Sequence, residues 1–217
     1  MKTIIFDMDG ILIDSEPLWK IAEIEAFAKV GLNTKATDFK ESVGLRIDEV
    51  VRLWHAKVKW TSKTCKEVED DIVNIVIREV HVQGKEMAGV TDLLKSLKSK
   101  GYKIGLATSS YQRIVDAVLS KLNIRQYFDV CHSAEHEKFG KPHPAVFMTC
   151  ADKLKVNHRD CLVFEDSLNG VISAKAAQMK VIAVPEACNG SNPKLIVADK
   201  IIDSLANFEV DSIDDFF

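Results

Sequence analysis

From residue 84 to the carboxyl terminus, short apolar strands alternate with amphipathic helices, and this pattern limits the possible folds more than any other feature of the chain. Apolar runs at residues 102–107, 161–164 and 181–184 have the length of buried strands. Strands that alternate with helices predict right-handed β-α-β crossovers and a parallel sheet. We therefore expect an α/β fold in which helices cover both faces of a parallel sheet.

Further elements complete this alternation. A strand is predicted at residues 3–8, and shorter ones at residues 127–131 and 201–202. Apolar residues spaced three and four positions apart predict the intervening helices, at residues 90–97, 114–122, 147–154 and 168–176.

Residues 16–82 interrupt this pattern with helices alone. Apolar residues recur at helical spacing from Ile47 to Val58 and from Val68 to Val76, and no strand signal of similar strength lies between them. Three or four helices are expected, packed as an all-helical unit with its own small core. The predicted domains are a catalytic core of residues 1–14 and 84–217 and a helical unit of residues 15–83, joined by two short hinges.

Composition narrows the class of protein and of partner. The 217 residues are 47% hydrophobic and 28% charged, which is typical of a soluble globular chain with one substantial core. A formal net charge of -3 gives no sign of nucleic-acid binding. The five cysteines are odd in number and form no C-x-x-C pair, which favours a reducing compartment. With no signal peptide or membrane span apparent, we expect a cytoplasmic protein without a membrane partner; a monomer is compatible with these features.

Polar side chains gather where the predicted strands end. Parallel α/β sheets bind ligands outside the carboxyl ends of their strands, so these side chains are expected to converge on one edge. They are Asp7 and Asp9 after the first strand, Thr108 and Ser109 after the second, Glu165 and Asp166 after a later one, and Lys141 in a loop that opens a helix.

These groups are suited to a phosphate monoester. The carboxylates of Asp7, Asp9 and Asp166 would repel the phosphate dianion unless a cation such as Mg²⁺ lay between them. Lys141 offers a fixed positive charge, and the Thr108 hydroxyl offers a directed donor. Asp7 can then attack phosphorus as a nucleophile, while Asp9 protonates the leaving alcohol and later deprotonates water.

Four segments resemble the four motifs of the haloacid dehalogenase-like hydrolase superfamily, and the helical unit resembles its helical cap. They are Asp7-Met8-Asp9-Gly10, Thr108-Ser109-Ser110, Gly140-Lys141-Pro142 and Glu165-Asp166-Ser167-x-x-Gly170. The resemblance implies a Rossmann-like core with an inserted cap, and Mg²⁺ as cofactor. It implies catalytic roles for Asp7, Asp9, Thr108 and Lys141, metal contacts from Asp7, Asp9, Glu165 and Asp166, and substrate contacts from Gly10, Ser109 and Ser110.

Specificity is expected to reside in the cap. Asp14-Ser15-Glu16, the stretch Gly44 to Asp48 and Leu53-Trp54 resemble bacterial hexitol and 2-deoxyglucose-6-phosphate phosphatases, which implies a small sugar or polyol phosphate as partner. Glu16, Trp19 and Arg46 are the candidate substrate contacts, because sugar hydroxyls favour charged partners and sugar faces favour aromatic rings. Packing within the cap is the competing interpretation for Trp19, and a solvated surface position is the competing one for Arg46.

Three functions remain open. The first is a Mg²⁺-dependent phosphatase that forms an aspartyl-phosphate, since dehalogenating relatives lack the second aspartate, here Asp9. The second is a sugar phosphomutase of the β-phosphoglucomutase type, although those relatives carry a histidine where this chain has Trp19. The third is a non-catalytic protein that binds a phosphorylated metabolite.

Overall fold

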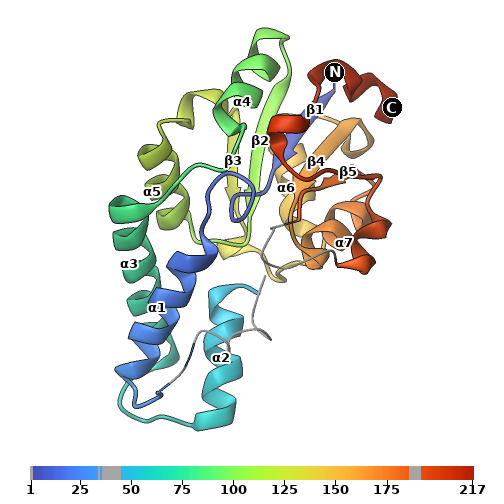
Figure 1. Ribbon diagram of the computed structural model, residues 1–217. Coiled ribbons are helices and arrows are strands. Elements are labelled where there is room, and N and C mark those ends of the chain that lie inside the picture. Colours follow the sequence, from blue (N-terminus) through green and yellow to red (C-terminus); the bar gives the residue numbers. More distant parts are fainter. Residues whose placement is uncertain (1, 34, 36–44, 186–191) are drawn as a thin grey trace.

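A six-stranded parallel sheet forms the centre of the computed structural model, in the order β3-β2-β1-β4-β5-β6 (Figure 1). The structure describes residues 2–33, 35, 45–185 and 192–217. All five strand pairs are parallel, so the predicted α/β fold is confirmed. The strands are β1 (Thr3–Phe6), β2 (Lys103–Thr108), β3 (Val130–Ser133), β4 (Cys161–Glu165), β5 (Lys180–Ala183) and β6 (Lys200–Ile201).

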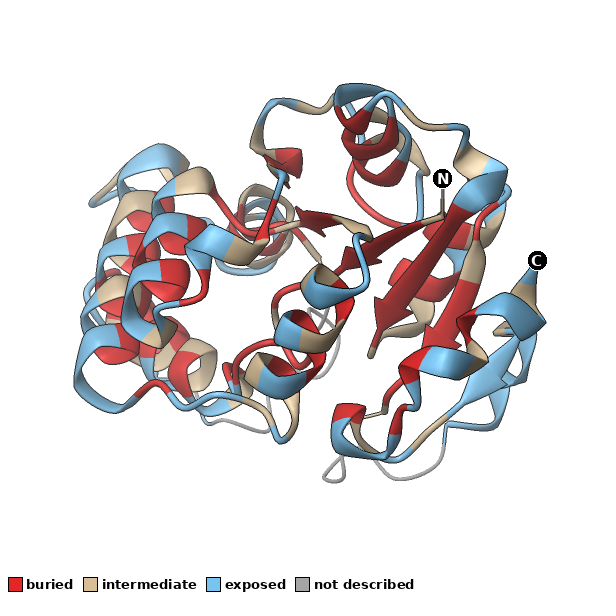
Figure 2. Ribbon diagram, turned by 90° about the horizontal axis from the view of Figure 1, so that it is seen from above, coloured by how far each residue is buried: buried red, intermediate tan, exposed pale blue. Residues whose placement is uncertain are grey.

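Helices cover both faces of this sheet. The apolar residues of α4 (Val90–Ser99) and α5 (Gln112–Leu122) belong to one buried cluster with one sheet face. Those of α6 (Ala145–Leu154) and α7 (Leu168–Ala176) belong to a second cluster, on the opposite face. Figure 2 shows the central strands buried, while the helices expose their outer sides. Among the described helices, none is long and apolar enough to cross a membrane.

The central strand β1 separates the two clusters. Ile4 and Phe6 belong to the first cluster and Ile5 to the second, as the period of two in a strand requires. Phe6 stacks on Phe164 of β4, with ring centroids 5.0 Å apart. Because β1 lies between β2 and β4, residues that follow these three strands are brought to one edge of the sheet.

The third strand begins later than predicted. Residues 127–131 were expected to be extended, but Tyr127 ends the short 3₁₀ helix η2 (Arg125–Tyr127). The Phe128 N–H bonds the Arg125 carbonyl within this turn at 3.2 Å, so pairing with β2 starts only where Asp129 N–H reaches the Ile104 carbonyl at 2.8 Å. Other 3₁₀ segments are η3 (Ala134–His136), η4 (His158–Asp160), η6 (Pro193–Val197), η7 (Leu205–Asn207) and η8 (Val210–Phe216).

Three helices follow the first strand, and we call them the cap helices: α1 (Glu16–Ala28), α2 (Ile47–Val58) and α3 (Cys65–Gln83). Pro17 lies in the first turn of α1, where a missing N–H costs no helical bond. A capping box starts α3: the Thr64 side chain accepts from Glu67 N–H, and the Glu67 carboxylate accepts from Thr64 N–H at 2.7 Å.

The separate small core predicted for these helices differs from the structure. Their buried residues, among them Phe27, Val51 and Ile72, join one continuous apolar cluster with the α4–α5 face of the sheet. The reason is that α3 packs against α5 as well as against α1 and α2.

The two connections to the cap helices run side by side. Asp14 N–H bonds the Lys85 carbonyl at 3.0 Å, and Met87 N–H bonds the Leu12 carbonyl at 3.1 Å. Ile13 and Glu86 form an isolated antiparallel bridge between these bonds. The cap helices therefore leave and rejoin the core at one place, and they form the end of the molecule away from both chain termini (Figure 1).

Glu23 of α1 makes the stability of the cap helices depend on pH. Its side chain is buried, with the residue only 7% exposed, and burial raises its pKa to about 8, although Lys20 lowers it slightly. Between pH 4.5 and 8 the unfolded chain ionises Glu23 while the folded one keeps the proton, so the free energy of unfolding falls as pH rises through this window. Glu23→Gln cannot ionise and should gain on the order of 3 kcal/mol over wild type between pH 4.5 and pH 8.

Urea unfolding at these two pH values measures this gain. Glu25→Gln is the matched control on the same helix, because the Glu25 carboxylate is exposed and accepts a bond from Arg78 at 2.7 Å. That variant should change stability by less than about 1 kcal/mol at either pH. An equal effect of Glu23→Gln at both pH values would contradict the prediction.

Candidate active site

A tight turn after β1 positions the two aspartates of the first motif. Asp7 N–H still bonds the Phe164 carbonyl of β4 at 3.0 Å, which fixes the nucleophile candidate at the strand end. The chain then reverses at Gly10, whose φ of 70° favours glycine. Gly10 N–H bonds the Ile13 carbonyl at 3.0 Å, and the Met8 carbonyl accepts from Leu12 N–H at 2.8 Å. Gly10 therefore shapes the turn, and its predicted substrate contact stays a prediction.

Lys141 reaches this strand end from the loop before α6. It is 5% exposed, and its Nζ lies 3.0 Å from Asp7 Oδ1 and 2.5 Å from Glu165 Oε1. Asp7 is 6% exposed and Glu165 is fully buried. Three of the predicted site residues thus form one buried ionic cluster.

Charge and burial act against each other in this cluster. Burial raises the pKa of the Asp7 carboxyl, the Lys141 ammonium lowers it, and the Glu165 and Asp9 carboxylates raise it further; the net direction is upward. Burial alone would lower the pKa of Lys141, but Asp7 and Glu165 outweigh it and raise that pKa, so Lys141 stays protonated. Additional positive charge beside the cluster would therefore favour the ionised form of Asp7.

The carboxylates are close enough to hold a cation. One ligand oxygen from each of Asp7, Glu165 and Asp166 lies within 4.8 Å of the others. Oxygen donors of this kind suit Mg²⁺, and the single charge of Lys141 does not balance three carboxylates. Both Glu165 oxygens are already engaged, Oε1 by Lys141 and Oε2 by Ser167 N–H at 2.9 Å and Ser167 Oγ–H at 3.0 Å. The metal contacts of Asp7, Glu165 and Asp166 stay predictions.

Gly170 leaves the space that Glu165 occupies. A Cβ at this position would lie 1.7 Å from Glu165 Oε1 and 1.9 Å from its Cδ. Moving the Glu165 side chain would break the hydrogen bonds that it accepts from Ser167 and Lys141. Gly170→Ala should therefore destabilise the fold by about 3 kcal/mol and, by displacing the anchor of Lys141, lower turnover by about 10²-fold. Thermal unfolding and phosphate release measure both effects.

Asn169→Ala, at the adjacent position of α7, is the control and should leave both quantities within about 0.5 kcal/mol or threefold of wild type. A Gly170→Ala variant with wild-type stability would show that Glu165 can relocate.

The second motif brings three hydroxyls to the same edge. Thr108 Oγ1 accepts from Ser110 N–H at 3.1 Å, which leaves the Thr108 hydroxyl proton as a donor. The Ser110 carbonyl accepts from Ser133 Oγ–H at 2.6 Å, so β3 supports this turn. The Ser109 hydroxyl is buried and has no hydrogen-bond partner among the described residues. Buried polar groups usually have a partner, so an unpaired donor here is compatible with a ligand contact.

Asp9 is bonded from two sides. Trp19 Nε1–H donates to Asp9 Oδ1 at 2.9 Å, and Ser110 Oγ–H donates to Oδ2 at 2.7 Å. Trp19 lies on α1, so this bond joins a cap helix to the turn after β1. The sequence predicted Trp19 and Ser110 as substrate contacts; the structure brings both to Asp9 instead, and a substrate contact remains a prediction.

Arg46 also joins a cap helix to the core. It precedes α2, is 8% exposed, and its Nη1 donates to the main-chain carbonyls of Ala134 at 3.1 Å and Glu137 at 2.6 Å. Asp48 faces its Nε at 3.1 Å. The surface interpretation of Arg46 is therefore wrong, because this guanidinium is buried against the loop after β3. Gly44 of the same motif lies outside the described residues.

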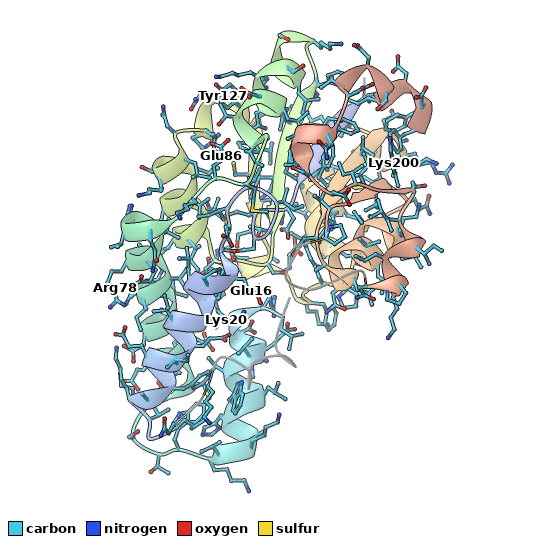
Figure 3. The ribbon with its side chains drawn as sticks, viewed as in Figure 1. Glu16, Lys20, Arg78, Glu86, Tyr127 and Lys200 are labelled. Carbon is cyan, nitrogen blue, oxygen red and sulfur yellow. The ribbon has the colours of Figure 1, made fainter. Side chains whose placement is uncertain are left out.

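Glu16, the remaining cap candidate, begins α1. Its Oε1 pairs with Lys20 Nζ at 2.6 Å, and Figure 3 shows both side chains on the part of α1 nearest the core. The structure thus brings Glu16 near the site, while its contact with substrate stays a prediction.

Two supporting contacts were not predicted from sequence. Ser167 caps α7 by accepting from Gly170 N–H at 3.0 Å while it donates to Glu165. Tyr111 Oη–H donates to Glu69 of α3 at 3.2 Å, next to the second motif. The Ser-x-x-Gly spacing before an apolar helix could have indicated the first; no local pattern indicates the second.

Comparisons with known proteins identify the family to which this chain belongs. Hexitol phosphatase B of Escherichia coli (strain K12) is 39% identical over 202 residues, which cover 93% of this chain and 91% of the relative. The phosphorylated carbohydrates phosphatase of Thermotoga maritima is 34% identical over 190 residues, 84% of each chain. The crystal structure of a β-phosphoglucomutase from Clostridium difficile superposes with a TM-score of 0.84 at 26% identity, over 100% of this chain and 96% of that one. The family described as haloacid dehalogenase-like hydrolase matches residues 4–184, and this chain belongs to it.

Proposed function

We propose that this protein is a Mg²⁺-dependent phosphatase that hydrolyses a small sugar or polyol phosphate through an aspartyl-phosphate. The observation that carries the proposal is the buried cluster in which Lys141 Nζ lies 3.0 Å from Asp7 Oδ1 and 2.5 Å from Glu165 Oε1, beside Asp166. Family membership and the names of the two related phosphatases support the substrate class. In this proposal residues 15–83 are the cap and residues 1–14 and 84–217 are the catalytic core.

The side chains divide the reaction between them. Asp7 attacks phosphorus with one carboxylate oxygen while the bond to the leaving oxygen breaks, and Asp9 gives that oxygen its proton. Asp9 then takes a proton from water, whose oxygen attacks phosphorus and releases inorganic phosphate from Asp7. Lys141 and the Thr108 hydroxyl orient the phosphoryl oxygens and offset their charge.

The donor set fits a magnesium ion. Asp7, Asp166 and the main-chain carbonyl of Asp9 would hold it, and when bound it supplies positive charge that balances the carboxylates and the phosphate dianion. Positive charge beside Asp7 would favour its ionised form, because burial and the Glu165 and Asp9 carboxylates raise its pKa.

A phosphate-release screen tests the proposal. Hexose, 2-deoxyhexose, hexitol, glycerol and nucleoside monophosphates are each incubated with the protein, with Mg²⁺ and with excess chelator. We expect release from hexitol or 2-deoxyhexose phosphate with Mg²⁺, loss with the chelator, and recovery when Mg²⁺ is restored. Absence of release from every compound would contradict the proposal and favour a protein that only binds a phosphorylated metabolite.

A phosphomutase is the second candidate, favoured by the structural likeness to β-phosphoglucomutase. It requires a phosphoenzyme that survives while the sugar turns around. Conversion of glucose 1-phosphate to glucose 6-phosphate faster than phosphate release, measured in a coupled assay, would favour the mutase.

A further inference from the structure

The two bonds to Asp9 come from different parts of the molecule, and this arrangement suggests a role for Trp19. One donor, Trp19 Nε1–H, belongs to cap helix α1, and the other, Ser110 Oγ–H, belongs to the core. We propose that Trp19 is a positioning residue for Asp9, through which docking of the cap orients the group that transfers the proton. This inference rests on the proposed function, in which Asp9 is the acid and base.

The two donors can orient the Asp9 carboxylate without blocking its proton transfer. An indole N–H can donate but cannot accept, so Trp19 restrains the carboxylate and takes no part in proton transfer itself. A carboxylate offers about four lone-pair positions, and the two donors use one on each oxygen of Asp9. Positions remain on Asp9 for the leaving oxygen or for water.

Both donors are themselves held in place. Trp19 N–H bonds the Ser15 carbonyl at 3.0 Å in the first turn of α1, and the Trp19 side chain packs against the main apolar cluster. Ser110 is fixed by its bond to Thr108 Oγ1 at 3.1 Å and by Ser133, whose hydroxyl bonds its carbonyl at 2.6 Å. Asp9 therefore meets two preorganised donors, the condition under which such bonds contribute most to catalysis.

Only one of the donors depends on the cap. Two further hydrogen bonds join the cap helices to the core. Arg46 Nη1 donates to the Glu137 carbonyl at 2.6 Å, and Tyr111 Oη–H donates to the Glu69 carboxylate at 3.2 Å. Movement of the cap away from the core would break the indole bond to Asp9 and leave the Ser110 bond intact. The orientation of the acid/base group is thus coupled to cap docking through Trp19.

The experiment compares two aryl phosphates with Trp19→Phe, which keeps an aromatic ring and loses the N–H. The leaving oxygen of phenyl phosphate needs a proton, because phenolate is a poor leaving group. The leaving group of p-nitrophenyl phosphate, p-nitrophenolate, departs readily as an anion. Because kcat/KM reports the first transfer, the variant should lower it about 10- to 100-fold for phenyl phosphate and less than about threefold for p-nitrophenyl phosphate. Ser110→Ala should show the same selectivity.

A second comparison uses Asp9→Asn as the background. If Trp19 acts through Asp9, adding Trp19→Phe to Asp9→Asn should lower kcat/KM for phenyl phosphate no further than Asp9→Asn alone, although Trp19→Phe lowers it in the unmodified protein. Trp60→Phe is the matched control, because Trp60 is a buried cap tryptophan whose Nε1 has no hydrogen-bond partner among the described residues. It should not change the ratio between the two substrates.

The outcomes separate this inference from the proposed function. Equal losses of kcat/KM on both substrates, or additive losses in the Asp9→Asn background, would overturn the role of Trp19 and identify it as a substrate or packing contact. Such a result leaves the phosphatase proposal intact, since the unmodified protein remains active. An unmodified protein that releases no phosphate overturns both.

Discussion

Replacing Asp7 with asparagine is expected to lower phosphate release by on the order of 10⁴-fold or more. The amide has nearly the shape of the carboxylate but cannot attack phosphorus, so the covalent step is lost. The fold should persist, because Lys141 keeps its contact with Glu165 at 2.5 Å and the Asp7 N–H bond to Phe164 involves the main chain only.

Initial rates with p-nitrophenyl phosphate and Mg²⁺ measure this loss, and equilibrium binding of inorganic phosphate tests whether the site survives. Asp92→Asn, the same chemical change at an exposed position of α4, is the control and should retain the wild-type rate. Turnover by Asp7→Asn at the wild-type rate would exclude Asp7 as the nucleophile.

Replacing Lys141 with methionine should damage both stability and turnover. Methionine fills a similar volume without the charge, and it leaves Asp7 and Glu165 buried against each other. Breaking a buried ion pair by removing one partner costs about 3 to 5 kcal/mol. Turnover should fall by about 10²- to 10³-fold or more, because the phosphoryl oxygens lose a fixed cation.

The stability loss should grow with pH. Burial raises the pKa of Asp7 and Lys141 opposes this rise, so without Lys141 the carboxyl holds its proton to still higher pH in the folded state. A folded-state pKa above the unfolded value means that stability is lost as pH rises through that window. Chemical denaturation of the chelator-treated protein should therefore show a larger deficit for Lys141→Met at pH 9 than at pH 5.

Lys138→Met is the matched control for this variant. Lys138 belongs to the same loop, is exposed, and lies over the Phe139 ring at 5.1 Å from its centroid. Its replacement should cost about 1 kcal/mol or less and leave turnover near the wild-type level. A similar loss of stability and turnover in both lysine variants would contradict the prediction. It would indicate that the effect comes from a change in the fold of the loop and not from the charge of Lys141.

Much of the core could be predicted because its signals are local. The strand at residues 161–164 is a continuous apolar run followed at once by polar residues, and it appears at that position in the sheet. The strand predicted at residues 3–8 also appears, although it ends at Phe6 because the chain turns after Asp7. The late start of β3 could not be predicted, since Tyr127 and Phe128 have β-friendly side chains while a turn starting at Arg125 takes their main-chain bonds.

The cap was harder to interpret. Helical periodicity identified α2 and α3, but it does not give the rotation of a helix about its axis relative to another domain. For this reason Arg46 could be assigned to solvent or substrate from sequence, whereas in the structure it bonds the Ala134 and Glu137 carbonyls.

By itself, the sequence predicted the class of fold and the family, and it predicted that Asp7, Asp9, Thr108, Lys141 and Asp166 converge on one edge of the sheet, because motif order and strand-end position are carried by neighbouring residues. Tertiary structure alone decided that Lys141 Nζ lies between Asp7 and Glu165, and that the Trp19 indole reaches Asp9 at 2.9 Å. The Trp19 contact depends on the packing of the cap helices against the sheet, which one shared apolar cluster fixes. The Lys141 contact depends on the packing of α6 against the opposite face of the sheet, through the second cluster, and no single segment contains either property.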